Sequence, residues 1–135
     1  MRKFVDDYEL RTELLKEQEA LDLKVQKGRI PRSQYKTQKK AIAARVEGLN
    51  RSLNEAEGVF RNSSPEFADL MEQLEQAEKD LNRTEAHVKS LEMQRKSGEI
   101  TIEEYKENIG DAEQEKETAE SVVNGILLQL REKIH

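Results

Sequence analysis

A carboxylate followed by a histidine is the one pairing in this sequence whose spacing could bind a metal ion. Glu132 and His135 have the Glu-x-x-His spacing that supplies iron ligands in helical bundles. Such a site needs the same spacing on a second helix, but the residue three before His87 is Thr84. The sequence therefore predicts no metal site, and His87 is expected to be a surface residue beside Val88.

The other reactive side chains do not form a catalytic set. The chain has no Cys, so it has no thiol nucleophile, zinc knuckle or disulfide. It also lacks a glycine-rich phosphate loop and the H-E-x-x-H and G-x-S-x-G motifs. Paired carboxylates such as Glu103 and Glu104 do not lie in an apolar run, which acid–base catalysis would need. We predict a non-enzymatic protein with no catalytic residues, no cofactor and no small-molecule substrate.

The composition favours long, solvent-exposed helices. Of the 135 residues, 38% are charged and only 4% are aromatic. This length is that of one ordinary domain, so residues 1–135 are expected to form a single helical domain. The N-terminus has no apolar core of signal-peptide length and no run approaches a membrane span, so we expect a cytoplasmic protein.

A short pattern, G-x-I-x-x-x-x-Y-K, begins at Gly28 and returns seventy residues later at Gly98. Each copy lies where one helical pattern ends and the next begins, and Gly tolerates the left-handed conformation that closes a helix. Seventy residues are ten heptads, so the two copies keep the same helical phase, which favours a duplicated hairpin. Alternatively, any two heptad helices can be slid into register, which accounts for the seam but less well for the shared Gly, Ile, Tyr and Lys of the turns.

Four helices are predicted around these turns. The first runs from about Asp6 to Lys27, and the second begins near Pro31, whose fixed φ suits a first helical turn. The third follows Ser64, a predicted N-cap. The fourth follows Thr101, which forms a capping box with Glu104 three residues later.

The apolar residues alternate at steps of three and four, which defines one inner seam on each helix. Lys39, Thr84 and Lys116 are polar residues on these seams. The inner face of the first helix contains Phe4, Tyr8, Leu10, Leu14, Leu21 and Val25. The inner face of the second contains Tyr35, Lys39, Ile42, Val46, Leu49, Leu53, Ala56 and Phe60. The inner face of the third helix contains Phe67, Leu70, Leu74, Ala77, Leu81, Thr84, Val88 and Leu91. The inner face of the fourth contains Ile102, Tyr105, Ile109, Ala112, Lys116, Ala119, Val123, Ile126, Leu130 and Ile134.

These seams predict an all-α fold, an antiparallel four-helix bundle or coiled coil built from two duplicated helical hairpins. The first hairpin covers residues 1–61 and the second residues 65–135. Short turns leave room only for antiparallel neighbours, and the step pattern favours packing at about 20°. Both G-x-I turns are then expected at one end and the chain termini at the other, where surplus apolar residues close the core or, alternatively, form a subunit interface.

The second turn, Gly98 to Tyr105, resembles the G-x-I-[ST]-x-E-E-[FY] turn of SHOCT-type short helical domains and of prokaryotic, notably archaeal, coiled-coil hairpins. The first copy is similar but departs from it between Pro31 and Gln34, where the Thr and Glu capping pair is absent. The resemblance covers only the turn in each copy. It implies a helix-turn-helix that mediates oligomer contacts, and it implies no activity.

The two turns carry opposite charge. From Lys24 to Val46 there are eight Lys or Arg and no acid, and from Glu99 to Glu120 there are nine acids and two Lys. The basic tip is defined here as Lys27, Arg29, Arg32, Lys36 and Lys40, and the acidic tip as Glu99, Glu103, Glu104 and Glu107. One interpretation is neutralisation within the first hairpin, by Glu9, Glu13, Glu17, Glu19 and Asp22.

The other interpretation is docking, and it gives the predicted function. The chain is then a structural or protein–protein interaction module whose partner is another protein, a second copy of itself, or both. The alternative is a regulatory module that binds an anionic surface, nucleic acid or membrane, through Lys24 to Arg45. A nucleic acid is a less favoured partner than a protein, because the net charge of the chain is −5. An anionic membrane is also less favoured, because no apolar face is free beside the basic stretch for insertion.

Overall fold

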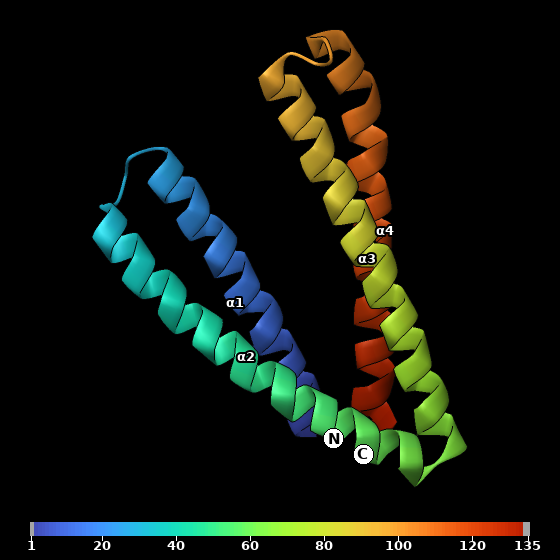
Figure 1. Cartoon of the computed structure of the whole chain (residues 1–135). Helices are drawn as coiled ribbons and strands as arrows, with labels where there is room; N and C mark the ends of the chain where they lie inside the picture. The colour runs from blue at the N-terminus through green and yellow to red at the C-terminus, as the bar shows by residue number, and fades with distance from the viewer. Residues whose placement is uncertain (1, 134–135) are drawn as a thin grey trace. The chain divides into compact units, whose positions relative to one another are not determined.

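The computed structural model describes residues 2–133, and this part of the chain is all-α. Four helices follow one another, α1 (Arg2–Gln26), α2 (Arg32–Ser63), α3 (Pro65–Ser97) and α4 (Ile102–Lys133). Figure 1 shows α1 running antiparallel to α2 and α3 running antiparallel to α4. The predicted class, all-α with four helices paired as antiparallel hairpins, is confirmed.

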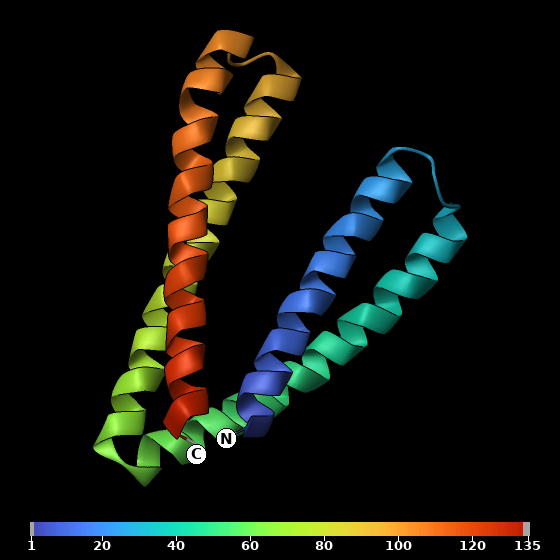
Figure 2. The same cartoon turned by 180° about the vertical axis from the view of Figure 1, so that it is seen from behind.

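The chain divides into two compact units, with the boundary between Ser63 and Ser64. Hairpin 1 is α1 with α2, and hairpin 2 is α3 with α4. The views from the front and from behind both show the two helices of each hairpin side by side (Figures 1 and 2). Ile134 and His135, which the sequence places at the end of the last seam and in the Glu-x-x-His pair, lie outside the described residues.

The start of α1 differs from the prediction, and the start of α2 agrees with it to within one residue. Helix α1 begins at Arg2, four residues before Asp6, because Phe4 and Val5 are buried and extend the apolar face. The ring of Phe4 packs edge-on against Phe60 of α2, with 5.5 Å between the ring centroids. Helix α2 begins one residue after Pro31, whose carbonyl accepts the first helical hydrogen bond from the Tyr35 N–H at 3.0 Å.

The seam of hairpin 2 is confirmed, with one correction. On α3 and α4 the predicted inner positions are buried or half-buried, including Thr84, whose hydroxyl donates to the Leu81 carbonyl at 2.8 Å. Ile102, however, is 59% exposed. It is the first residue of α4, and Ile100 of the turn packs against the nearest buried cluster beside Tyr105 and Ile109.

The seam of hairpin 1 has the predicted phase but is less closed. Leu14, Leu21 and Leu53 are buried, whereas the remaining inner positions of α2 are only half-buried. Tyr35, expected to be buried, is among the half-buried residues. Its hydroxyl needs a polar partner and finds Asp22 of α1, so the ring stays at the edge of the seam.

The helix ends are confirmed where the sequence predicts side-chain caps. The hydroxyl of Ser64 accepts a hydrogen bond from the Phe67 N–H at 3.2 Å, and Pro65 occupies the first turn of α3. The Thr101 hydroxyl accepts from the Glu104 N–H at 3.1 Å, and the Glu104 carboxylate accepts from the Thr101 N–H at 3.5 Å.

None of the described helices combines the length and the apolar character that crossing a membrane would require.

Candidate functional site

The turn of hairpin 1 is closed by backbone hydrogen bonds around Gly28. The Gly28 N–H donates to the Val25 carbonyl at 3.1 Å, and the Arg29 N–H donates to the Lys24 carbonyl at 2.9 Å. This pair of bonds is a Schellman motif, which requires a left-handed residue. Gly28 has a φ of 69°, which a residue with a side chain rarely adopts.

The turn of hairpin 2 repeats these bonds seventy residues later. The Gly98 N–H donates to the Arg95 carbonyl at 3.2 Å, and the Glu99 N–H donates to the Gln94 carbonyl at 2.9 Å. Gly98 has a φ of 79°. The two tips therefore share one backbone design, so the side chains distinguish them.

The basic tip is exposed. All five of its cations, on the turn and within the first nine residues of α2, are exposed to solvent. Within the part of the chain that the structure describes, none of them forms a salt bridge. Lys24 and Arg45, at the two ends of the basic stretch, are exposed as well.

The acidic tip is exposed too, but its four members are not equivalent. The carboxylate of Glu104 accepts hydrogen bonds from the backbone N–H and the hydroxyl of Thr101. Among the described residues, no hydrogen bond or ion pair is formed by the side chains of the other three acids, Glu99, Glu103 and Glu107. Reversing the charge of Glu104 would therefore also remove the cap of α4. The other three acids are the ones whose charge is available for a partner.

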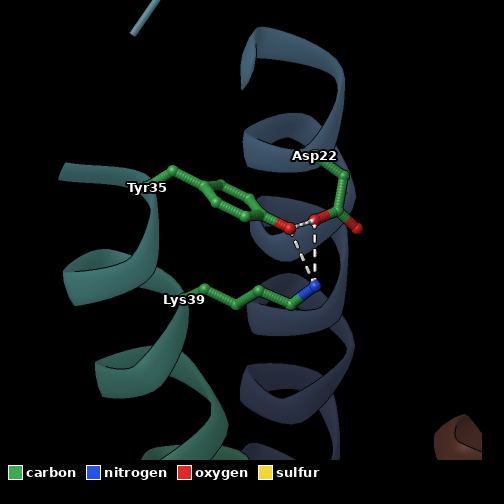
Figure 3. Close-up of polar contacts among 3 residues, drawn as sticks. All are labelled: Asp22, Tyr35 and Lys39. Carbon is green, nitrogen blue, oxygen red and sulfur yellow. Dashed lines mark hydrogen bonds and ion pairs between the residues drawn. The ribbon is translucent and has the colours of Figure 1, made fainter. Parts of the chain in front are cut away.

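Behind the basic tip lies a small polar cluster that connects the two helices of hairpin 1 (Figure 3). The Tyr35 hydroxyl donates to Asp22 Oδ1 at 2.5 Å, and Lys39 Nζ contacts the same oxygen at 3.2 Å. Lys39 Nζ also donates to the Tyr35 hydroxyl at 2.8 Å. The bond to Tyr35, followed by that to Asp22, raises the pKa of the Lys39 ammonium above its ordinary 10.5.

The same place in hairpin 2 is apolar. Val88, Leu91 and Ala112 form a buried cluster against which Ile100, Tyr105 and Ile109 pack. By the repeat, Ile109 corresponds to Lys39 and Tyr105 to Tyr35. This cluster offers Tyr105 no carboxylate like that of Asp22. The Arg95 guanidinium instead lies over the Tyr105 ring, with its carbon 4.9 Å from the ring centroid.

Of the five acids predicted to neutralise the basic stretch, Asp22 pairs with one of its cations, Lys39. Another contact between α1 and α2 is a hydrogen bond from Arg11 Nη1 to Asn50 Oδ1 at 2.8 Å. Sequence reasoning missed the cluster of Asp22, Tyr35 and Lys39. The available signal was a Lys on the seam one turn after a Tyr, which needs an acidic partner on the facing helix.

His87 is exposed on α3, as predicted. Among residues 2–133, no group of three or more His, Asp or Glu side chains is placed to hold a metal ion. Glu132 lies within this range but its predicted partner His135 does not, so that pair is not described.

Comparisons of this chain with protein-family models, with curated proteins and with solved structures found no match. The resemblance of the Gly98 turn to SHOCT-type turns therefore stays a prediction.

Proposed function

We propose that this protein is a non-enzymatic interaction module, a helical scaffold that self-assembles when the basic tip of one molecule binds the acidic tip of another. The observation that carries the proposal is the shared turn geometry with opposite, exposed and unneutralised charge. Like-charged side chains at each tip repel one another, so bringing the opposite tip close lowers the electrostatic energy of both.

The contact is expected to depend on salt. Each exposed ion pair contributes only about 0.2–1 kcal/mol, so the contact needs several pairs at once. The five cations and the three available acids supply them, and complementary patches also accelerate association. At about 1 M salt the Debye length falls to about 3 Å, which removes most of this attraction.

Crosslinking tests the geometry directly, because the chain has no natural cysteine. One preparation carries Arg29→Cys at the basic tip and a second carries Glu99→Cys at the acidic tip. Mixing the two is expected to give a disulfide-linked heterodimer at low salt and little of it at high salt. Each preparation alone should give far less, because like-charged tips repel. Equal yields in the mixed and unmixed samples would contradict the proposal.

Charge reversal tests the same contact with a matched control. Glu103→Lys with Glu107→Lys in the Glu99→Cys chain should abolish the heterodimer, while leaving the cap made by Glu104 intact. Glu113→Lys with Glu117→Lys makes the same charge change with the same spacing at exposed positions of α4 outside the tip. That control should crosslink normally. A similar loss in both chains would mean that only net charge matters.

The second candidate is binding of an anionic surface through Lys24 to Arg45. It is favoured by the exposure of every cation in this stretch except Lys39, which is half-buried and bonded to Asp22. Phosphate contacts release counterions, so binding to a nucleic acid or to anionic vesicles should weaken steeply with salt. No mobility shift and no vesicle co-sedimentation at low salt would exclude this candidate, and would leave the tip contact unaffected.

A further inference from the structure

A second surface of hairpin 1 has the character of an interface. A shallow groove of about 420 Å³ runs along one face of the hairpin, between α1 and α2. Its lining includes Glu17, Ala20, Leu21 and Lys24 from α1, and Ala41 and Ile42 from α2. None of the basic-tip or acidic-tip residues lines it.

On the seam of α2, Ile42 lines this groove, and Leu49 lies two turns further along the helix, outside the lining. Ile42 and Leu49 are only half-buried, whereas their counterparts in hairpin 2, Ala112 and Ala119, are 1% and 8% exposed. At these two positions of α2 the larger side chains keep part of their apolar surface in contact with solvent. Burying the remaining apolar area would contribute about 25 cal/mol per Å², so these residues favour a covering surface.

The charges on α1 indicate what that covering surface is. Glu17 lies at one end of the groove and Lys24 two turns further along at the other, with Ala20 and Leu21 between them. Neither charge forms a salt bridge among the described residues. A two-fold axis through the middle of this segment would place each Glu17 opposite Lys24 of the other molecule, because an isologous contact pairs residue i with j and j with i.

We propose that a second copy of this chain covers the groove, hairpin 1 against hairpin 1, in an antiparallel two-fold contact centred near Ala20. Small side chains at Ala20 and Ala41 allow the helices to approach, and Leu21 and Ile42 supply the apolar centre. This interface goes beyond the tip contact proposed above and uses different residues. It can therefore exist with or without that contact.

A single cysteine near the axis tests the symmetry. In an isologous contact a residue close to the axis meets its own copy, so an Ala20→Cys chain is expected to form a disulfide-linked homodimer under mild oxidation. Lys16→Cys is the matched control, since Lys16 is exposed on α1 but does not line the groove. The same yield from both cysteines would overturn the proposal.

A charge swap tests the pairing. Glu17→Lys or Lys24→Glu alone places like charges opposite each other twice per dimer, and should raise the dissociation constant of the dimer about tenfold or more. The double variant, Glu17→Lys with Lys24→Glu, restores both pairs and should recover the original value. Lys16→Glu changes the charge outside the groove and should have little effect. Failure of the double variant to recover would overturn the proposed axis.

These measurements separate the two interfaces when they are made in the Glu103→Lys, Glu107→Lys background, which lacks the tip contact. A dimer that persists there and responds to the charge swap supports the groove contact. A monomer at all concentrations in that background overturns it, whatever the tips do. Circular dichroism of each variant confirms that the helices are intact, so a loss of dimer is not a loss of fold.

Discussion

Hairpin 1 and hairpin 2 place a tyrosine at the same point after the same turn, yet the surroundings of the two rings differ. Tyr35 bonds to Asp22 and Lys39 in a polar cluster, whereas Tyr105 packs with Ile109 beside a buried apolar cluster. The turn and the seam phase are common to both, so they fix which positions face inward. The size and polarity of the side chains at those positions then decide how far each hairpin closes.

The two hairpins differ in how completely they bury their seams, and this difference bears on the two proposed interactions. Hairpin 2 has small residues at its seam, including Ala77, Ala112 and Ala119, and closes on itself. Hairpin 1 has larger or polar residues there and leaves part of its seam in contact with solvent. A self-sufficient hairpin is suited to presenting an acidic tip, and an incompletely closed one is suited to binding a second copy.

The largest expected effect comes from truncating Leu91 in hairpin 2 or Leu21 in hairpin 1, two buried leucines that correspond by the repeat. Leu91→Ala should destabilise hairpin 2 by about 3 kcal/mol, because it leaves a cavity in the cluster with Val88 and Ala112. Leu21→Ala should cost hairpin 1 about 2 kcal/mol or less, because its site opens into the groove and can relax. Amide hydrogen exchange in each hairpin, on dilute monomer, measures both values. A higher cost for Leu21 would contradict the comparison.

Exchanging Lys39 and Ile109, which occupy the same position of the two seams, should give a smaller effect that is unequal in the two hairpins. Ile109→Lys should destabilise hairpin 2 by about 1–2 kcal/mol, since it removes partly buried apolar surface and adds a charge beside it. Lys39→Ile should leave the stability of hairpin 1 nearly unchanged, because the lost ion pair is partly exposed and exposed pairs contribute little. Denaturant unfolding of the two variants provides the measurement. Equal losses would show that the seams are equivalent.

The caps should produce an effect of about 1 kcal/mol or less. Thr101→Ala removes one side of the capping box of α4 and should cost about 1 kcal/mol. Hairpin 1 has Pro31 and Gln34 at the matching positions, so Pro31→Thr with Gln34→Glu should install a box and gain about 0.5 kcal/mol. Exchange rates of the first-turn amides of α2 and α4 report each change. An unprotected first turn in the engineered α2 would contradict this expectation.

The sequence predicts well what depends on neighbours three or four residues apart. The left-handed Gly28 and Gly98, the cap at Ser64 and the Thr101 box follow from such local spacing, and so do the seam positions. It predicts less well which of several neighbouring apolar residues packs against a buried cluster. Ile102 has the correct periodicity but is exposed, because Ile100 packs there instead.

The candidate site divides in the same way. The charges of both tips could be read directly from the sequence, and their exposure follows from their place on the turns or at helix positions outside the seams. The Asp22 contact could not, because the pairing of a residue on α1 with Tyr35 and Lys39 depends on how the turn sets the register of two helices. The groove also required the structure, since its depth depends on side-chain sizes across the hairpin.

The smallest effect expected is a pH dependence confined to hairpin 1. Because its bonds to Tyr35 and Asp22 raise the pKa of Lys39 in the folded state, the contact stabilises hairpin 1 fully below the ordinary pKa of 10.5. That contribution is lost as pH rises through the raised pKa, when the ammonium loses its proton. Hairpin 1 should therefore lose amide protection above pH 10.5 more steeply in the natural chain than in Lys39→Met. Hairpin 2 has Ile109 at this position and serves as the internal reference, so the same difference between the two chains in α3 and α4 would show that Lys39 is not its source.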